Sequence, residues 1–334
     1  MEQKIVVSTA VAPGTPTLYE REALDAPDIE FALRGPCHTP QEVLAAVRGA
    51  QVALCMREPY TREVFAGAPG LRMVMRYGVG FDTIDLDAAT EFGVIVGYLP
   101  DFCTDEVANH AIVLLLTCAK KVLQVDHALR TQGFLQARQI LPGMGQIHGE
   151  TLGLIAFGRI GKATAVRAQA LKMRVIAYDP YLAPEVFAQH GVESVSLDEV
   201  AARSDYVSCH LPLSAETRAM INARFFSRMK PSAYFVNTSR GAVVNEPDLI
   251  SALQHKQIAG AGLDVFEREP PAADNPLLSM PNVVLTPHSA SYADETMVNQ
   301  KRRVGRDALR VARGGLPDFV ANPEVLAKLG LAGG

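Results

Sequence analysis

The feature that most restricts the fold of this chain is a series of short apolar runs separated by helical stretches. In the first hundred residues these runs are KIVVSTA, DIEFAL, QVALCM, LRMVMRYG and GVIVGYLP. Beyond residue 150 they are LGLIAFG, RVIAYDP, YVSCHLP, AYFVNTSRG, AGAGLDVF and NVVLTPH. Several are apolar almost throughout, as expected of parallel strands that are buried on both faces. Strands that alternate with helices predict an α/β fold with doubly wound parallel-sheet domains.

The segment between the two sets of strands predicts a hinge and a long helix. LPDFCT, residues 99–104, is expected to be the hinge, and the following stretch up to Gly133 is expected to form one helix capped by Thr104. The tail from about Glu295 is again helical in pattern and can return to the first set of strands. We therefore expect one domain from residues 1–104 and 295–334 and a second from residues 105–294.

Composition and charge argue against several classes of protein. A net charge of -4 gives no general attraction to nucleic acid or to anionic lipid. The longest apolar run, residues 111–119, is too short to cross a bilayer, and the N-terminus is better explained as a first strand than as a signal peptide. The five cysteines have neither disulfide-framework nor zinc-ligand spacing. We expect a cytoplasmic protein with free thiols and no metal site.

The stretch GLIAFGRIGK, which begins at Gly153, indicates a dinucleotide-binding turn. Gly158 and Gly161 occupy the second and third glycine positions of the G-x-G-x-x-G pattern, and Ala156 replaces the first. A strand precedes the turn, a helix follows it, and the next strand ends at Asp179, as in a βαβ nucleotide-binding unit. If the backbone at residue 156 needs no positive φ, the extra methyl costs less than about 1 kcal/mol.

The same unit predicts which dinucleotide binds. The backbone amides of Arg159 and Ile160 would face the pyrophosphate at the helix N-terminus. Asp179 would accept hydrogen bonds from the adenosine ribose, where a 2′-phosphate would meet a carboxylate. Because the following DPYLAPE offers no arginine to offset that charge, NAD is favoured over NADP.

Three polar residues follow successive strands in the second set and suggest a catalytic group. They are Arg240 in VNTSRG, Glu269 in LDVFEREP and His288 in LTPHSA. Ligands bind at the carboxyl ends of the strands in an open α/β sheet. Hydride transfer between a hydroxy acid and NAD needs a proton relay, which histidine supplies best near neutral pH. A carboxylate would orient the histidine ring, but the pattern alone does not choose between Glu267 and Glu269.

The chain is similar, nearly end to end, to the D-2-hydroxyacid dehydrogenase family. The resemblance rests on RYGVGFDTIDLDAA, AFGRIG, YDP, HLPLSAET, VNTSRGAVVNEPDLISAL, GAGLDVFEREP and TPH. It implies that Arg240 is catalytic, that His288 is the acid/base and that Glu269, rather than Glu267, is its partner. The resemblance also implies a flavodoxin-like substrate domain interrupted by a Rossmann NAD-binding domain, through which members of the family usually dimerise.

The resemblance further implies residues that bind NAD and the substrate. Asp264 would hold the nicotinamide carboxamide, and the backbone of Val79 and Gly80 would bind the substrate carboxylate. The other implied NAD-binding residues are Thr104, Gly158, Arg159, Ile160, Gly161, Asp179, Leu211, Pro212, Thr217, Thr238 and Ser239.

The choice of substrate depends on two arginines. Arg57 and Arg76 match positions at which D-3-phosphoglycerate dehydrogenases carry arginines toward the substrate phosphate, which implies an anionic 2-hydroxy acid. Both arginines could instead pair with acids such as Glu58 or Asp82. The alternative substrates are glyoxylate, hydroxypyruvate or another small 2-oxo acid. YDPYL and TPHSASYADE also resemble the NAD-sensing C-terminal binding proteins, so a binding module is the alternative from another class.

Overall fold

The computed structural model describes residues 3–331, which divide into two compact units. Unit 1 comprises the chain up to Phe102 and from Ala293 onward, and unit 2 comprises Cys103–Tyr292. Each junction falls two residues before the expected position. Both units are α/β structures with parallel sheets, so the predicted fold class is confirmed.

The sheet of unit 1 has five parallel strands in the order β2-β1-β3-β4-β5. This is the order of flavodoxin-like domains, as the resemblance implied. All residues of β3 and β4 are buried, which explains why these strands are continuous apolar runs in the sequence. The strands span Lys4–Ser8 (β1), Ile29–Leu33 (β2), Val52–Cys55 (β3), Met73–Arg76 (β4) and Ile95–Gly97 (β5).

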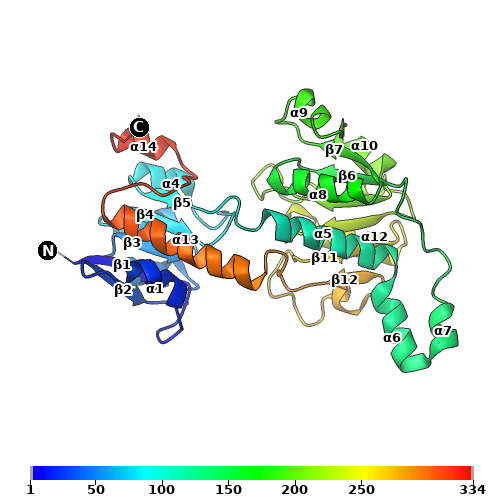
Figure 1. Ribbon diagram of the computed structural model, residues 1–334, viewed down its shortest axis with the longest axis horizontal. Helices are drawn as coiled ribbons and strands as arrows, with labels where there is room; N and C mark the ends of the chain where they lie inside the picture. Colours follow the sequence, from blue (N-terminus) through cyan, green and yellow to red (C-terminus); the bar gives the residue numbers. More distant parts are fainter. Residues whose placement is uncertain (1–2, 332–334) are drawn as a thin grey trace. The chain divides into compact units, whose positions relative to one another are not determined.

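The long C-terminal helix α13 belongs to unit 1, where it packs along α1 (Figure 1). It buries Val304, Ala308 and Val311 against the central strands and exposes most of its arginines, so it is strongly amphipathic. The helices of this unit are α1 (Leu18–Leu24), α2 (Pro40–Val47), α3 (Arg62–Gly67), α4 (Leu86–Glu91), α13 (Asp294–Ala312) and α14 (Glu324–Lys328).

The sheet of unit 2 has seven strands in the order β12-β11-β10-β9-β6-β7-β8, and the paired strands are parallel. The strand order reverses between β6 and β9, which is where dinucleotides bind in Rossmann domains. The two-residue strand β8 was not predicted, because it is too short to form an apolar run. The strands span Thr151–Ile155 (β6), Arg174–Tyr178 (β7), Glu193–Ser194 (β8), Tyr206–Cys209 (β9), Tyr234–Asn237 (β10), Gly260–Leu263 (β11) and Val283–Leu285 (β12).

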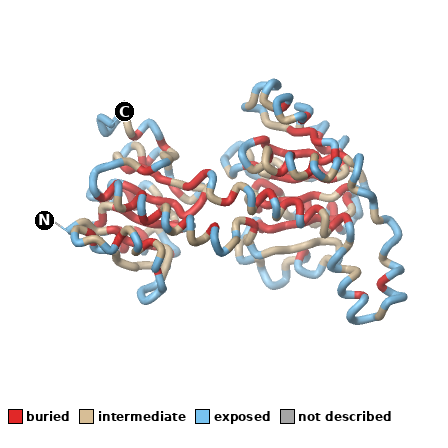
Figure 2. Tube along the Cα trace, viewed as in Figure 1, coloured by how far each residue is buried: buried red, intermediate tan, exposed pale blue. Residues whose placement is uncertain are grey.

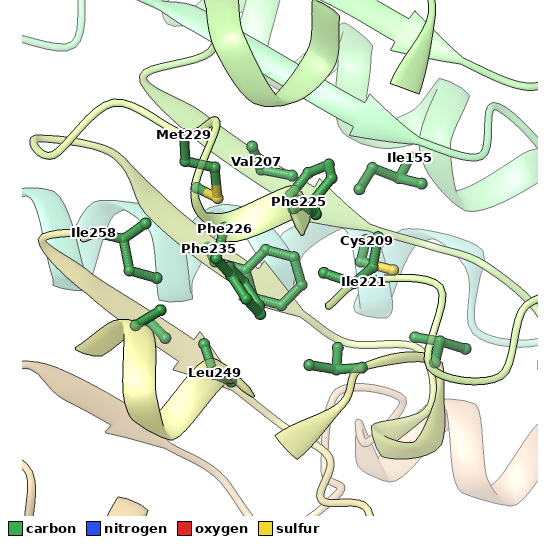
Figure 3. Packing of buried hydrophobic residues seen from close by; sticks show 14 of the residues in the cluster. Ile155, Val207, Cys209, Ile221, Phe225, Phe226, Met229, Phe235, Leu249 and Ile258 are labelled. Atoms are coloured by element: carbon green, nitrogen blue, oxygen red, sulfur yellow. The ribbon is translucent and has the colours of Figure 1, made fainter. Parts of the chain in front are cut away.

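Helices cover the sheet of unit 2, and its central strands are buried, whereas β8 at one edge is exposed (Figures 1 and 2). Figure 3 shows one core, where Val207 of β9 and Phe235 of β10 pack against Phe225 and Phe226. The α-helices are α5 (Thr104–Ala119), α6 (Val122–Gln132), α7 (Phe134–Arg138), α8 (Arg159–Ala170), α9 (Pro184–Ala188), α10 (Leu197–Arg203), α11 (Ala223–Phe226) and α12 (Glu246–Gln254). Short 3-10 helices span Gly241–Val243 and Pro276–Ser279.

The expectation of a single helix up to Gly133 is wrong. Helix α5 ends at Ala119, and Lys121 adopts a left-handed conformation with a φ of 49° before α6 begins. The Lys121 ammonium donates hydrogen bonds to the carbonyls of Ile140 and Pro142, which holds the turn. Thr104 is also the first residue of α5 rather than its cap, whereas Gly133 ends α6 as expected.

The cysteines are free and buried, in agreement with the sequence analysis. Burial raises the pKa of the Cys118 thiol to about 12 and that of Cys209 to about 11, so both are protonated near neutral pH. Among residues 3–331, no helix is both long and apolar enough to cross a membrane.

Candidate active site

The predicted dinucleotide turn lies at the carboxyl end of β6, where α8 begins with Gly158 as its N-cap. A Cβ added to Gly158 would meet no atom within 4 Å, so the space in front of the helix N-terminus stays open. A Cβ on Gly161 would lie 2.5 Å from the Ala156 carbonyl oxygen, so this glycine is needed for close packing. The amides of Arg159 and Ile160 lie in the first helical turn, where they have no intrahelical acceptor. This geometry fits a pyrophosphate.

Ala156 corrects one premise of the sequence analysis. Its φ is 71°, in the left-handed region. The small cost expected for its methyl group holds only if the backbone at this residue has no positive φ. The amide of Ala156 donates to the Tyr178 carbonyl on β7 at 2.8 Å, which fixes the turn. An L-residue in this conformation costs about 1–2 kcal/mol, so alanine is not a neutral replacement for glycine at this position.

Asp179 follows β7, and its carboxylate already braces the turn. One oxygen accepts the Phe157 amide at 3.0 Å and the other accepts the Tyr181 amide at 3.1 Å. The side chain remains partly exposed, and a carboxylate has further lone pairs for ribose hydroxyls. Tyr181 donates its hydroxyl to Glu216 at 2.7 Å, a contact that the sequence pattern did not suggest.

The loop after β9 carries Leu211, Pro212 and Thr217. The Thr217 hydroxyl donates to the Pro212 carbonyl at 2.6 Å and accepts the Ser214 amide at 2.8 Å, which closes the loop on itself. Leu211 is buried, whereas Pro212 is exposed. Burial lowers the pKa of the preceding His210 to about 4, so this histidine adds no charge to the loop near neutral pH.

The turn after β10 carries Thr238, Ser239 and Arg240. Buried Asn237, which the sequence analysis did not single out, organises this turn: its carbonyl oxygen accepts the Ser239 amide, and its side-chain amide donates to the Arg240 carbonyl at 3.0 Å. The Thr238 hydroxyl is buried without a hydrogen-bond partner among the described residues. A buried polar group without a partner is costly, so this hydroxyl fits a site that a bound dinucleotide completes.

His288 and Glu269 meet as the sequence analysis expected. The His288 Nδ1 atom lies 3.0 Å and 2.9 Å from the two carboxylate oxygens of Glu269. Both side chains are mostly buried, with 30% and 21% of their surfaces exposed. Because a carboxylate only accepts hydrogen bonds, Nδ1 carries a hydrogen and Nε2 is the nitrogen that can exchange a proton. Glu269 also accepts the Phe266 amide at 3.2 Å, which fixes the carboxylate.

Asp264 follows β11, and its carboxylate faces the segment that carries His288. It is 0% exposed, and it accepts the Thr286 hydroxyl at 2.6 Å and the amides of Ser289 and Ala290 at 2.8 Å and 2.9 Å. Its role toward the nicotinamide stays a prediction. Thr286 was not singled out from the sequence, although it lies in the TPH stretch.

The predicted substrate-binding residues lie in unit 1, at the carboxyl ends of β3 and β4. Arg76 is 9% exposed, and its guanidinium donates to the carbonyls of Tyr77 and Gly80 at 2.5 Å and 2.8 Å. It thus braces the loop whose amides, at Val79 and Gly80, are predicted to bind the carboxylate. Arg57 is exposed and lies two residues beyond Cys55. Cys55, the last residue of β3, lies opposite Arg76 in the register of β3 with β4.

Comparisons with known proteins agree with this geometry. The sequence model for "D-isomer specific 2-hydroxyacid dehydrogenase, NAD binding domain" matches residues 112–290, more than half of the chain. The chain belongs to the D-isomer specific 2-hydroxyacid dehydrogenase family. It is an NAD-dependent oxidoreductase that acts on the CH–OH group of 2-hydroxy acids, in agreement with the cofactor and enzyme class expected from the sequence.

Individual relatives bear different names. A glyoxylate reductase of Korarchaeum cryptofilum is 41% identical over 81% of this chain and 82% of its own length. A D-3-phosphoglycerate dehydrogenase of Archaeoglobus fulgidus is 39% identical over 75% of this chain, which spans only 47% of that protein. In structure, D-lactate dehydrogenase of Aquifex aeolicus, solved with NAD and lactic acid, has a TM-score of 0.80 at 28% identity and covers 98% of this dehydrogenase and 97% of its own chain.

The first prediction concerns the dinucleotide turn of this dehydrogenase. Ala156→Gly should stabilise the protein by about 0.5–1 kcal/mol, because relief of the left-handed strain exceeds the added chain entropy of glycine. The midpoint of thermal unfolding should rise by about 1–3 °C. NADH affinity, measured by fluorescence titration, should hardly change.

Two other variants serve as controls for this prediction. Gly158→Val should abolish NADH binding, because it fills the open space before the helix N-terminus. Ala165→Gly, in the buried interior of α8, should lower the unfolding midpoint. A lowered midpoint in Ala156→Gly would contradict the assigned strain.

Proposed function

We propose that this dehydrogenase interconverts an anionic 2-hydroxy acid, such as 3-phosphoglycerate, with its 2-oxo acid. His288 acts as the acid/base. Glu269 orients the imidazole and compensates its positive charge, and Arg240 binds and polarises the reacting group. The observation that carries these roles is the contact of His288 Nδ1 with both oxygens of Glu269 at the carboxyl edge of the unit 2 sheet.

The reaction divides between NAD and the protein. NAD supplies a hydride acceptor or donor when it is bound. In the direction of oxidation, the hydroxyl proton would pass to His288 Nε2 as the carbon that bears the hydroxyl gives up its hydrogen as a hydride, so that a C=O bond forms. The resulting imidazolium lies beside the Glu269 carboxylate, which compensates its positive charge. Reduction reverses both transfers.

Arg240 supplies a fixed positive charge. A guanidinium stays protonated throughout the reaction and can bind the substrate carboxylate or the carbonyl oxygen through two donors. One nitrogen of the Arg240 guanidinium donates to the Ser239 carbonyl at 2.9 Å. The backbone carbonyl of Arg240 accepts a hydrogen bond from the side-chain amide of Asn237. These bonds define the backbone from which the arginine side chain extends, so its charge is positioned in advance.

The amides of Val79 and Gly80 would bind the substrate carboxylate, supported by Arg76. The Arg76 guanidinium is committed to the carbonyls of this loop, so its first effect is on the loop's shape. Arg57 is therefore the better candidate for contact with an anionic tail such as a phosphate, since it is exposed at the end of the neighbouring strand.

Glyoxylate or hydroxypyruvate reduction is the second candidate function, and it has about equal support. Glyoxylate reductases match this chain over most of their own length, as the Korarchaeum cryptofilum relative does at 82%. Glyoxylate has no tail for Arg57 to bind, so this arginine distinguishes the two proposals.

We also propose that the protein is a homodimer that pairs through helices α6 and α7. These helices project from the body of unit 2 and are mostly exposed (Figures 1 and 2). They carry Leu123, Leu129, Phe134 and Leu135 with exposed fractions of 53%, 48%, 65% and 71%. An exposed apolar arm of this kind supports a second copy of the chain as its partner.

The second prediction tests the catalytic roles. Arg240→Ala and His288→Ala should lower kcat/KM by about 10²–10⁴-fold, because each removes charge or proton transfer from the transition state. NADH affinity should stay nearly unchanged. The assay is NADH oxidation against a panel of 2-oxo acids, with His255→Ala, at the C-cap of α12, as the control. Tight NADH binding without turnover of any acid by the native protein would instead favour an NAD-sensing binding module.

The third prediction separates the substrates. Arg57→Ala should raise KM for phosphorylated 2-oxo acids about 10-fold or more and spare glyoxylate, because only the former carry a second anion. Arg76→Ala should impair both, since the carboxylate loop loses its brace. Arg62→Ala, an exposed arginine on α3 paired with Glu91, is the matched control and should affect neither. An equal effect of Arg57→Ala on both acids would count against an anionic tail.

The fourth prediction concerns assembly. Replacing both Phe134 and Leu135 by serine should convert the dimer to a monomer in light scattering after size exclusion, because it removes the two most exposed apolar side chains of the arm. Leu18→Ser on α1, where the side chain is 69% exposed, should leave the mass unchanged. A native protein that is monomeric at micromolar concentration would refute the proposal.

A further inference from the structure

The catalytic turn around His288 has an unusual backbone. His288 has a φ of 54°, in the left-handed region that residues with a Cβ rarely adopt. Its amide donates to the Asp264 backbone carbonyl at 2.7 Å. A residue in such a conformation persists only where its surroundings fix it, and such residues occur at functional sites. The groups that fix this turn therefore bear on the reaction.

The Asp264 carboxylate ties down the chain on both sides of His288. It accepts the Thr286 hydroxyl at 2.6 Å on one side, and the Ser289 and Ala290 amides at 2.8 Å and 2.9 Å on the other. Because Asp264 is 0% exposed, water does not compete for these hydrogen bonds. The turn thus has a defined shape only while these donors stay in place.

His110 of α5 completes this network. Its Nε2 atom lies 2.9 Å from the Thr286 hydroxyl and 3.6 Å from an Asp264 oxygen. The Thr286 hydroxyl has one hydrogen, and the short contact to Asp264 uses it, because a carboxylate can only accept. The Thr286 oxygen must therefore accept from His110, so His110 carries a hydrogen on Nε2.

Helix α5 gives this network a rigid anchor. It packs against β10, β11 and β12, and its residues Ala111, Leu114 and Leu115 are buried in the core of unit 2. A hydrogen bond from His110 therefore fixes Thr286 relative to the sheet, not merely relative to its own loop. A displacement of about 1 Å at a reacting group can cost about 100-fold in rate.

We propose that His110 and Thr286 are positioning residues for the reaction: through Asp264 they hold His288 in the left-handed conformation that directs its imidazole to Glu269 and to the substrate. This inference rests on the proposed role of His288. It assigns the two residues a function in kcat, whereas residues that merely stabilise the fold would change the unfolding midpoint alone.

The test compares variants that break the link with variants that keep it. Thr286→Val and His110→Leu should lower kcat about 10- to 100-fold while NADH affinity stays within about twofold of the native value. Thr286→Ser keeps the hydroxyl and His110→Gln keeps a donor, so both should recover most of the loss. All assays are run well below each variant's unfolding midpoint, which keeps stability out of the comparison.

A double variant decides whether the two residues act through one link. Because His110 acts only through Thr286, the double variant of Thr286→Val and His110→Leu should be no slower than Thr286→Val alone. Losses that multiply, a native kcat in both single variants, or equal losses in the conservative variants would each overturn the inference.

His288→Ala, assayed in parallel, separates the two proposals. If it is inactive while the Thr286 and His110 variants retain native kcat, the positioning role is wrong and the proposed function stands. If it is active, the proposed function falls and the positioning role falls with it.

Discussion

The carboxylate of Asp264 lies fully buried at the end of β11, where a polar group is tolerated only if hydrogen-bond donors surround it. Four donors from residues 286–290 meet that need, and together they fold the segment that carries His288 into one conformation. Replacing the carboxylate would leave these donors without an acceptor as well as removing a charge. The approach of His288 to Glu269 thus depends on a group that need not touch the substrate.

The edge of the unit 2 sheet carries backbone strain at two places. Ala156 and His288 are both left-handed residues with a Cβ, and they follow β6 and β12, the first and last strands of this sheet in the chain. Each is fixed by a hydrogen bond to a neighbouring strand or its end, from Ala156 to Tyr178 and from His288 to Asp264. The buried sheet provides the stability that permits both conformations.

Much of the fold could be predicted because parallel strands are apolar on both faces and leave a clear pattern. The spacing of Gly158, Gly161 and Asp179 likewise predicted a strand–turn–helix unit, which β6 and α8 form, since each position has a separate steric or chemical requirement. The left-handed backbone of Ala156 could not be predicted, because alanine gives no signal for positive φ. The helix break at Lys121 was missed for the same reason: the sequence there has neither glycine nor proline.

Tertiary contacts account for the rest of what the sequence could not provide. VNTSRG and TPH mark Arg240 and His288, but no local pattern states that Asn237 shapes one turn or that His110, 176 residues before Thr286, anchors the other. Arg76 shows the same limit. Sequence position alone favours a substrate contact for both arginines, yet the donors of a buried guanidinium must be satisfied within the protein, and the carbonyls of Tyr77 and Gly80 satisfy two of them. Under the proposed function, discrimination between acids that share a carboxylate and differ in their tails would therefore depend more on exposed Arg57 than on Arg76, whose loss would deform the loop for every acid.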